Sequence, residues 1–493
     1  MNKFIKISSL ALIPLLMVGC KKEYLETGSS TDISNILIFE STTNAKNALE
    51  GMYRLTYTFG LVGGGHSDFG QKSYDIVNDL MGNDMVVNSQ GYGWFNRDYQ
   101  YVSSQNINDG ARPFTIWKYY YVLINNANNI IVNIDKAVGP DADKKSMKGQ
   151  AKAMRAFCYY NLINYYQQTY KGNENAKGVP IYLVPGKEGN PRGTVKQVYD
   201  QIISDLNDAE GLLTGLPAEH KSHIDLRTCQ GIRARVALTM EDWITAASYA
   251  NKARTGYTPM GPTDYKKGFN SVSNPEWMWG AEVITDQATI YASFFSHMDA
   301  LSNGGVSYAG LGGQKKITKE LYDKINVADV RNAIFKKPGT GTTAVPDYCQ
   351  TKFKLANPSS WAADYLYMRA SEMYLIEAEA LARQTNDPAA KTVLESLIKT
   401  RYPAYVAPAS GSALLDEIIT QRRIELWGEG FGYFDVKRLK TGLNRPTGAG
   451  NHGSPNFNPS VTTFANSDYR LAFKIPNKEF ETNTSFTTAD QNP

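Results

Sequence analysis

The 493-residue chain has only four cysteines and five histidines, and its formal charge is nearly balanced at +4. Cys158, Cys229 and Cys349 lie far apart and are odd in number, so they do not form a disulfide framework, even in an exported protein. The small net charge disfavours a nucleic-acid-binding surface, which would need clustered basic residues. After the first twenty residues there is no run of 18 apolar residues, so no membrane-spanning helix is predicted.

Motifs for catalysis or cofactor binding are equally scarce. The glycine-rich stretches 60–70 and 337–343 lack the G-K-[ST] of a phosphate-binding loop, so loop flexibility is the favoured interpretation. No G-x-S-x-G or Cys/His signature occurs. His220 and His223, with Asp225 nearby, have a metal-ligand spacing, but they follow a turn and lack an evident third ligand. The motifs thus indicate no cofactor and no metal, and with five histidines a hydrolase would have few general bases, although carboxylates remain.

The first twenty residues predict export and anchoring. Lys3 and Lys6 precede an apolar segment, 7–18, that is too short to span a bilayer. Gly19 and Cys20 follow, and this order resembles a bacterial lipobox, in which Cys20 would be acylated and become the new N-terminus. The alternatives are a plain signal peptide with an incidental cysteine or a short N-terminal membrane anchor.

The remainder of the chain is predicted to be mainly helical. Apolar spacing predicts helices over 112–135, 146–170, 194–213, 226–254 (two helices meeting near Glu241), 365–384 and 416–438. Small residues at Gly149, Ala153 and Ala156 would let helices approach closely, and the helix pairs resemble degenerate tetratricopeptide units. The stretches 58–112, 256–316 and 336–362 are too long for ordinary connections and are expected to carry function.

Passages along the chain resemble one family in a consistent order. They are Trp117 to Asn128, Gly149 to Tyr159, "YMRASEMYLIEAEAL" (367–381), "QRRIELWGEGFGYFDVKR" (421–438) and the tail "FKIPNKEFETN…QNP" (473–493). Together they resemble the SusD/RagB lipoproteins of the Bacteroidota, of the starch-utilisation type. The chain departs from the family pattern at Gln421 and Gly432, where Glu and a basic residue are usual.

The resemblance implies both a fold and a role. It implies a tetratricopeptide-like helix-pair scaffold bearing an irregular loop-rich second domain, divided here into a signal segment (1–20), an N-terminal region (21–255) and a C-terminal region (256–493). It also implies an outer-membrane lipoprotein, facing the cell exterior, that passes oligosaccharide, or in some branches peptide, to a SusC-like TonB-dependent transporter without cleaving it. A mixed-charge segment, Lys21 to Glu23, follows Cys20, where acidic residues often favour surface display.

The ligand site is expected in the long loops, where aromatic faces would stack on sugar rings. In 88–101 the candidates are Tyr92, Trp94, Phe95, Asn96 and Arg97, although Trp94 could equally plug a core beneath the loop. Further candidates, in segments that also fit an amphipathic helix, are Tyr291, Phe294, His297 and Tyr308. Trp277 and Trp279 alternate as in a strand, so only one face of that strand could meet a ligand.

Charged residues near the C-terminus have a structural interpretation. Arg422, Glu425 and Glu429 share one helix stripe, and Asp435 and Arg438 are three apart, so an inward-facing ion network is expected. A glycosidase carboxylate pair is the alternative, but one helix face rarely supplies an opposed acid and nucleophile. Two alternatives to a glycan-binding protein remain. One is a secreted glycoside hydrolase, and the other is a scaffold that docks the transporter and has no ligand pocket of its own.

Overall fold

The computed structural model describes residues 37–301, 305–453 and 456–493, so the expected acylation site at Cys20 lies outside the described residues. The helices are α2 (Thr42–Arg54), α3 (Gln71–Leu80), α4 (Asn96–Tyr99), α5 (Arg112–Asn133), α6 (Asp141–Tyr166), α7 (Val195–Leu213), α8 (Leu226–Met240), α9 (Trp243–Arg254), α10 (Pro262–Tyr265), α11 (Phe294–Met298), α12 (Lys319–Tyr322), α13 (Ala370–Arg383), α14 (Asp387–Ile398), α15 (Gly411–Glu425), α16 (Gly432–Arg438) and α17 (Asn477–Thr482). The strands are β1 (Met85–Val87), β2 (Lys177–Pro180), β3 (Arg192–Thr194), β4 (Trp277–Ala281), β5 (Lys315–Ile317), β6 (Tyr365–Arg369), β7 (Leu443–Asn444) and β8 (Thr463–Phe464). These strands form only antiparallel pairs, β1–β5, β2–β3, β4–β6 and β7–β8.

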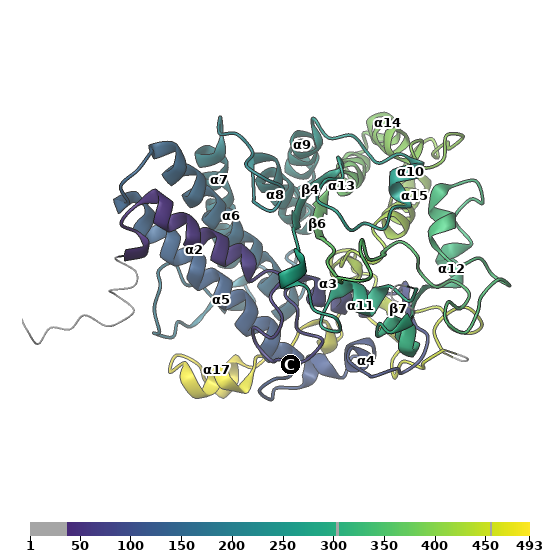
Figure 1. The fold of residues 1–493 in the computed structure, drawn as a ribbon, viewed down its shortest axis with the longest axis horizontal. Coiled ribbons are helices and arrows are strands. Elements are labelled where there is room, and N and C mark those ends of the chain that lie inside the picture. The colour runs from purple at the N-terminus through teal and green to yellow at the C-terminus, as the bar shows by residue number, and fades with distance from the viewer. Residues whose placement is uncertain (1–36, 302–304, 454–455) are drawn as a thin grey trace, which may run out of the picture.

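The long helices pack as consecutive pairs, which confirms the helix-pair scaffold (Figure 1). Helix α6 packs against both α5 and α7, α8 packs against α9, and α9 packs against α13. Gly149 on α6 explains one close approach, because a Cβ atom there would lie 2.8 Å from Leu213 Cγ at the end of α7. The shorter helices α4, α11 and α12 lie among the irregular segments, on the other side of the molecule from α2, α6 and α7.

Local sequence signals account for several helix boundaries. Thr194 caps α7 in a capping box with Gln197, as the sequence indicates. Helix α8 ends at Met240, and the next residue, Glu241, adopts a left-handed conformation with φ of 62° before α9 begins. Helix α6 begins at Asp141, five residues before the predicted start at Ser146. The sequence does not reveal this first turn because the turn is polar and has no apolar spacing.

Residues 365–369 were predicted as helix and are strand β6. All five residues are buried, and they pair antiparallel with β4. A fully buried run of five residues fits either structure, since periodicity distinguishes them only where one face is exposed. Trp277 and Trp279 lie in β4, as the alternation predicts, but both rings are buried, so neither can contact a ligand.

The single helix predicted over 416–438 is broken into α15 and α16. The break falls at Gly428 and Gly430, which have φ of 81° and 95°. A Cβ atom on Gly430 would lie 2.6 Å from Cβ of Asp75, so this turn needs glycine for both its conformation and its packing. The apolar spacing continues through the break, and it therefore hides the turn.

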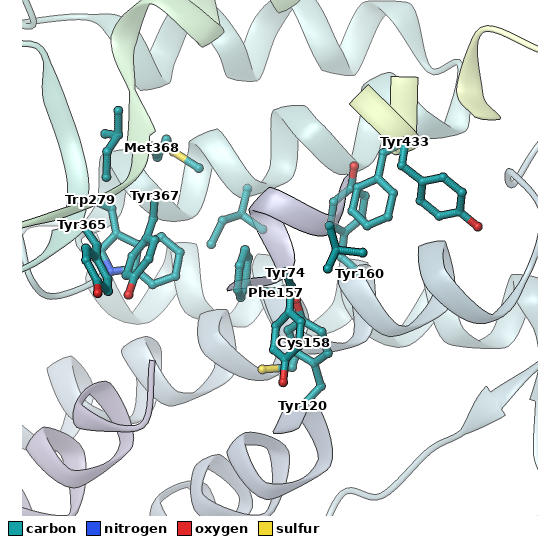
Figure 2. Close-up of a cluster of buried hydrophobic side chains, with 14 of the residues drawn as sticks. Tyr74, Tyr120, Phe157, Cys158, Tyr160, Trp279, Tyr365, Tyr367, Met368 and Tyr433 are labelled. Carbon is teal, nitrogen blue, oxygen red and sulfur yellow. The ribbon is translucent and has the colours of Figure 1, made fainter. Parts of the chain in front are cut away.

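Buried tyrosines make a large contribution to the core (Figure 2). Tyr74 and Tyr120 lie buried beside Cys158 between helices. The Tyr74 hydroxyl donates to the carbonyl of Thr115 at 3.2 Å, and the Tyr120 hydroxyl donates to Gln71 Oε1 at 3.0 Å. Buried rings with satisfied hydroxyls explain why most of the 31 tyrosines are structural.

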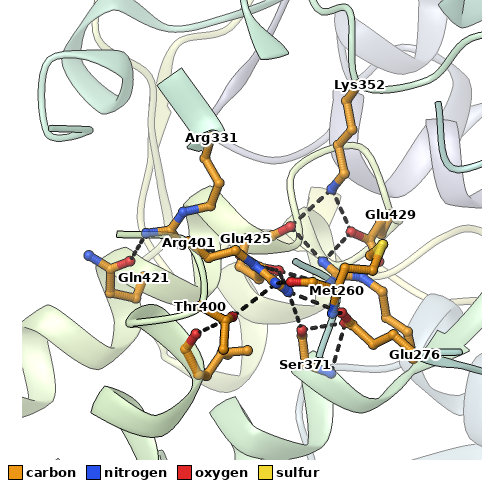
Figure 3. Close-up of polar contacts among 12 residues, drawn as sticks. Met260, Glu276, Arg331, Lys352, Ser371, Thr400, Arg401, Gln421, Glu425 and Glu429 are labelled. Atoms are coloured by element: carbon orange, nitrogen blue, oxygen red, sulfur yellow. Dashed lines mark hydrogen bonds and ion pairs between the residues drawn. The ribbon is translucent and has the colours of Figure 1, made fainter. Parts of the chain in front are cut away.

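Of the charged residues expected in one ion network, Glu425 and Glu429 lie in a buried network at the junction of β6, α13 and α15 (Figure 3). Arg422, Asp435 and Arg438 instead form a separate cluster with Glu379. Glu425 bonds to Arg331, Arg369 and Arg401, and all four side chains are buried. The network also includes Glu276, Asp329, Lys352 and Glu429. Burial opposes ionisation of Glu425, but Arg401, Arg369 and Arg331 outweigh it and hold its pKa well below the usual value. A buried carboxylate already paired with three arginines is no candidate for glycosidase chemistry.

Candidate ligand-binding site

Two loops that are distant in sequence meet beside α4 and α11. The first, residues 88–95, bends at Gly91 and Gly93, which have φ of 49° and 79°. The second, residues 305–313, leads into β5. Ser89 Oγ donates to the carbonyl of Gly312, and a Cβ atom on Gly91 would lie 3.1 Å from the nitrogen of Gly313. The glycines therefore allow the two loops to touch.

Six rings gather where these loops meet, and we call them the aromatic platform: Phe59, His66, Tyr92, Trp94, Tyr291 and Tyr308. Tyr308 lies at the centre, with ring centroids 5.2 Å from Tyr92, 6.1 Å from Trp94 and 5.3 Å from Tyr291. The exposed fraction is 68% for Tyr92 and 39% for both Trp94 and Tyr291, whereas Tyr308 is nearly buried. The platform thus has a fixed base and a solvent-facing rim.

The structure brings together four of the predicted site residues, Tyr92, Trp94, Tyr291 and Tyr308. Trp94 does not plug a core, because a large part of its ring is exposed. Phe95 was wrongly assigned to the site: its exposed fraction is 3%, and its ring packs edge-on against His297 at 4.8 Å. Phe95 anchors the loop from below, so that Trp94, the preceding residue, is held at the surface.

Other candidates support the platform or lie beside it. The Asn96 side chain donates to the carbonyl of Gln90 at 2.9 Å and so shapes the loop. The exposed Arg97 side chain has no hydrogen-bond partner within the described residues and lines a neighbouring cleft. Phe294 and His297 are both buried, but only the His297 ring stacks on a platform ring, that of Tyr308, whereas Phe294 packs against Phe353. Burial lowers the pKa of His297 to about 3, so this ring is neutral.

A polar cleft of about 450 Å³ adjoins the platform at Trp94. Its lining includes Gly63, Asp68, Trp94, Arg97, Asp98, Asn106, Asn108, Asp109 and Arg112. Asp68 Oδ2 accepts from the backbone nitrogens of Val62 and Gly63, at 2.9 Å and 2.7 Å. Its Oδ1 is buried without a hydrogen-bond partner in the described part of the chain. An unpaired buried carboxylate oxygen is costly, because it loses its hydrogen bonds to water and gains none from the protein.

Sequence reasoning missed Phe59, His66 and Asp68. His66 and Asp68 lie in the glycine-rich stretch 60–70, which was interpreted only as flexible. Gly70 in fact allows close packing, since a Cβ atom there would lie 2.1 Å from the carbonyl oxygen of Thr56. A histidine and an aspartate directly after three glycines were the available signal.

The histidines at 220 and 223 each lie near a glutamate side chain. His223 Nε2 lies 3.0 Å from Glu50 Oε1, and His220 Nε2 lies 3.9 Å from Glu282 Oε2. Within residues 37–301, 305–453 and 456–493, no group of three or more His, Cys, Asp or Glu side chains is arranged to hold a metal ion. In the same ranges, no helix has the length and apolar content needed to cross a membrane.

Two family models match the chain. One, described as "Starch-binding associating with outer membrane", matches residues 40–238, and the other, the SusD family model, matches residues 339–493. A curated relative, SusD-like protein P38 of Formosa agariphila, is 26% identical over 231 residues, which are 45% of this chain. The match spans 40% of that relative's length.

Solved structures match the fold over nearly the whole chain. A SusD-like carbohydrate-binding protein from Bacteroides vulgatus is 28% identical, with a TM-score of 0.81, and the match covers 92% of this chain and 99% of that one. Surface glycan-binding protein A from Bacteroides thetaiotaomicron, in complex with laminarihexaose, is 19% identical with a TM-score of 0.69, and the match covers 91% and 99%. The chain therefore belongs to the SusD family and has its helical, tetratricopeptide-like fold.

Proposed function

We propose that the protein binds an oligosaccharide on the aromatic platform and delivers it to a SusC-like TonB-dependent outer-membrane transporter. The observation that carries the proposal is the half-exposed set of rings at Tyr92, Trp94 and Tyr291, held in place by Tyr308. Rings that stay exposed although they are large and apolar mark a binding surface, and their faces suit the apolar faces of sugar rings.

The polar cleft beside Trp94 would complete the site. Arg97 has donors without partners in the described residues, and the amides of Asn106 and Asn108 lie in the same lining. A few placed polar groups beside apolar rings are the usual composition of a small-molecule site. An uncharged polyhydroxy ligand meets these needs, since each hydroxyl both donates and accepts.

The proposed membrane anchoring and the proposed transporter partner are inferred from the family and from the N-terminal sequence. Acylation at Cys20 would hold the protein on the outer membrane, facing the cell exterior, where it could pass ligand to a transporter. The proposed activity is binding without bond cleavage. A peptide ligand, a pure docking role and a hydrolase are the alternatives to be separated by experiment.

Affinity electrophoresis of the chain from Lys21 to Pro493 tests the proposal. The gels would contain laminarin, starch, xylan or mannan, and incubation of the same glycans with the protein would be assayed for new reducing ends. We expect at least one polysaccharide to retard the protein, with no reducing ends released. Retardation by none, with binding to a peptide library instead, would replace the glycan with a peptide ligand; release of reducing ends would identify a hydrolase.

A further inference from the structure

His66 makes ring contacts with four members of the aromatic platform. Its ring centroid lies 5.2 Å from that of Trp94, 6.1 Å from that of Tyr291 and 5.7 Å from that of Tyr308. The fourth contact is with Phe59, whose ring centroid lies 5.9 Å from that of His66 in an edge arrangement. The Tyr291 ring is nearly parallel to the imidazole, at 12°. The imidazole therefore joins the rings of the 88–95 loop to the rings of the second half of the chain.

One hydrogen bond holds this imidazole and a second holds the backbone of the same residue. His66 Nδ1 shares a hydrogen bond with the hydroxyl of Tyr308, and the backbone carbonyl of His66 lies 2.9 Å from Nε2 of the buried His297. The loop also runs close to Trp94, because a Cβ atom on Gly65 would lie 3.3 Å from Trp94 Cζ3. The ring is held in one orientation by groups that are themselves buried or packed.

The second ring nitrogen of His66, Nε2, is available to a ligand. Within the described residues it has no hydrogen-bond partner, and the residue is partly exposed. Since Nδ1 is occupied by Tyr308, Nε2 is a fixed polar atom among four aromatic rings. Flat stacking on the rings gives affinity with little selectivity, whereas a fixed polar atom among them favours a ligand with a hydroxyl at the matching position.

We propose that His66 is a ligand-positioning and specificity-determining residue, whose Nε2 forms a hydrogen bond with a hydroxyl group of a sugar ring stacked on the aromatic platform. This inference rests on the proposed glycan-binding function. The ring nitrogens have separate roles: Nδ1 orients the imidazole through Tyr308, and Nε2 contacts the ligand.

Three substitutions separate these roles. In His66→Gln the side-chain amide reaches the place of Nε2, in His66→Asn it reaches the place of Nδ1, and His66→Phe keeps a ring with neither nitrogen. The three variants, the unaltered chain from Lys21 to Pro493 and Trp94→Ala would be run in gels containing laminarin, starch, xylan or mannan. Laminarin is included because one related structure holds laminarihexaose. Thermal unfolding would check that each variant is folded.

We expect His66→Phe and His66→Asn to bind about tenfold more weakly than the unaltered chain, the effect of one lost hydrogen bond, and His66→Gln to keep most of the affinity. Unchanged binding in His66→Phe, with binding lost in Trp94→Ala, would overturn the role of His66 and leave the glycan site intact. Wild-type-like binding in His66→Asn with loss in His66→Gln would also overturn it, because His66 would then act only by supporting Tyr308. If no polysaccharide retards the unaltered chain, the proposed function fails and this inference fails with it.

Discussion

The guanidinium of Arg369 and the carboxylate of Glu425 lie 2.8 Å apart, although 56 positions separate them in the chain, and neither is exposed to water. The contact joins the end of β6 to the end of α15, while Arg401 and Arg331 bond to the same carboxylate (Figure 3). The network thus links β6 to α15 within the second half of the chain.

Replacing Glu425 with Gln is expected to lower the free energy of unfolding by about 3–5 kcal/mol, because buried arginines would lose their counter-charge. Chemical denaturation monitored by circular dichroism measures this. Asp416→Asn is the matched control, since Asp416 lies on the same helix, α15, and is exposed. Equal, small effects of the two substitutions would show that the network contributes little to stability.

Acid is expected to destabilise the protein through the same network. The arginines hold the pKa of Glu425 well below its usual value, and the pKa values of Glu276 and Glu429 are lowered against the opposing effect of burial. A carboxylate whose folded pKa is depressed stabilises the protein above its unfolded pKa, about 4.3, and loses that contribution as pH falls through the folded value. The melting temperature should therefore fall steeply below about pH 4. A melting temperature independent of pH between 5 and 2 would contradict this.

Substitutions at two residues of one loop, Phe95 and Tyr92, should have different effects on stability and on glycan binding. Phe95→Ala removes a buried ring and should lower the free energy of unfolding by about 3–5 kcal/mol. Tyr92→Ala removes a ring that is 68% exposed, so it should weaken glycan retardation and leave the melting temperature within a few degrees. Thermal unfolding and affinity gels on both variants test this, and a large loss of stability in Tyr92→Ala would place its ring in the core.

The thiols at positions 158, 229 and 349 should be unreactive while the protein is folded. Burial raises the pKa of Cys349 to about 12, and it also raises the pKa of Cys158 and Cys229. Because the thiolate is the nucleophile, a disulfide reagent at pH 8 should label none of them in the folded chain from Lys21 onward. All three should react in guanidinium chloride. Rapid labelling without denaturant would indicate local opening around a cysteine.

The helical scaffold could be predicted because its signals are local. Spacing and a cap residue located α5, α7, α8 and α9, whereas β6 was missed because its five residues are buried on both faces. The site was predicted only in part. Trp94 and Phe95 are adjacent aromatic residues in one loop, and which ring faces water depends on how that loop lies over His297. The proposed role of His66 could not be predicted, because both of its hydrogen-bond partners, Tyr308 and His297, lie more than 200 positions away in the sequence.

The most direct test of the account compares the unaltered chain from Lys21 to Pro493 with Trp94→Ala in polysaccharide gels. Tyr469→Ala is the control, because Tyr469 is also half exposed and, among the described residues, contacts none of the platform rings. We predict that at least one polysaccharide retards the unaltered chain and Tyr469→Ala equally, and that Trp94→Ala migrates as it does without glycan. Equal retardation of all three proteins would show that the glycan binds elsewhere and would contradict the assignment of the aromatic platform as the site.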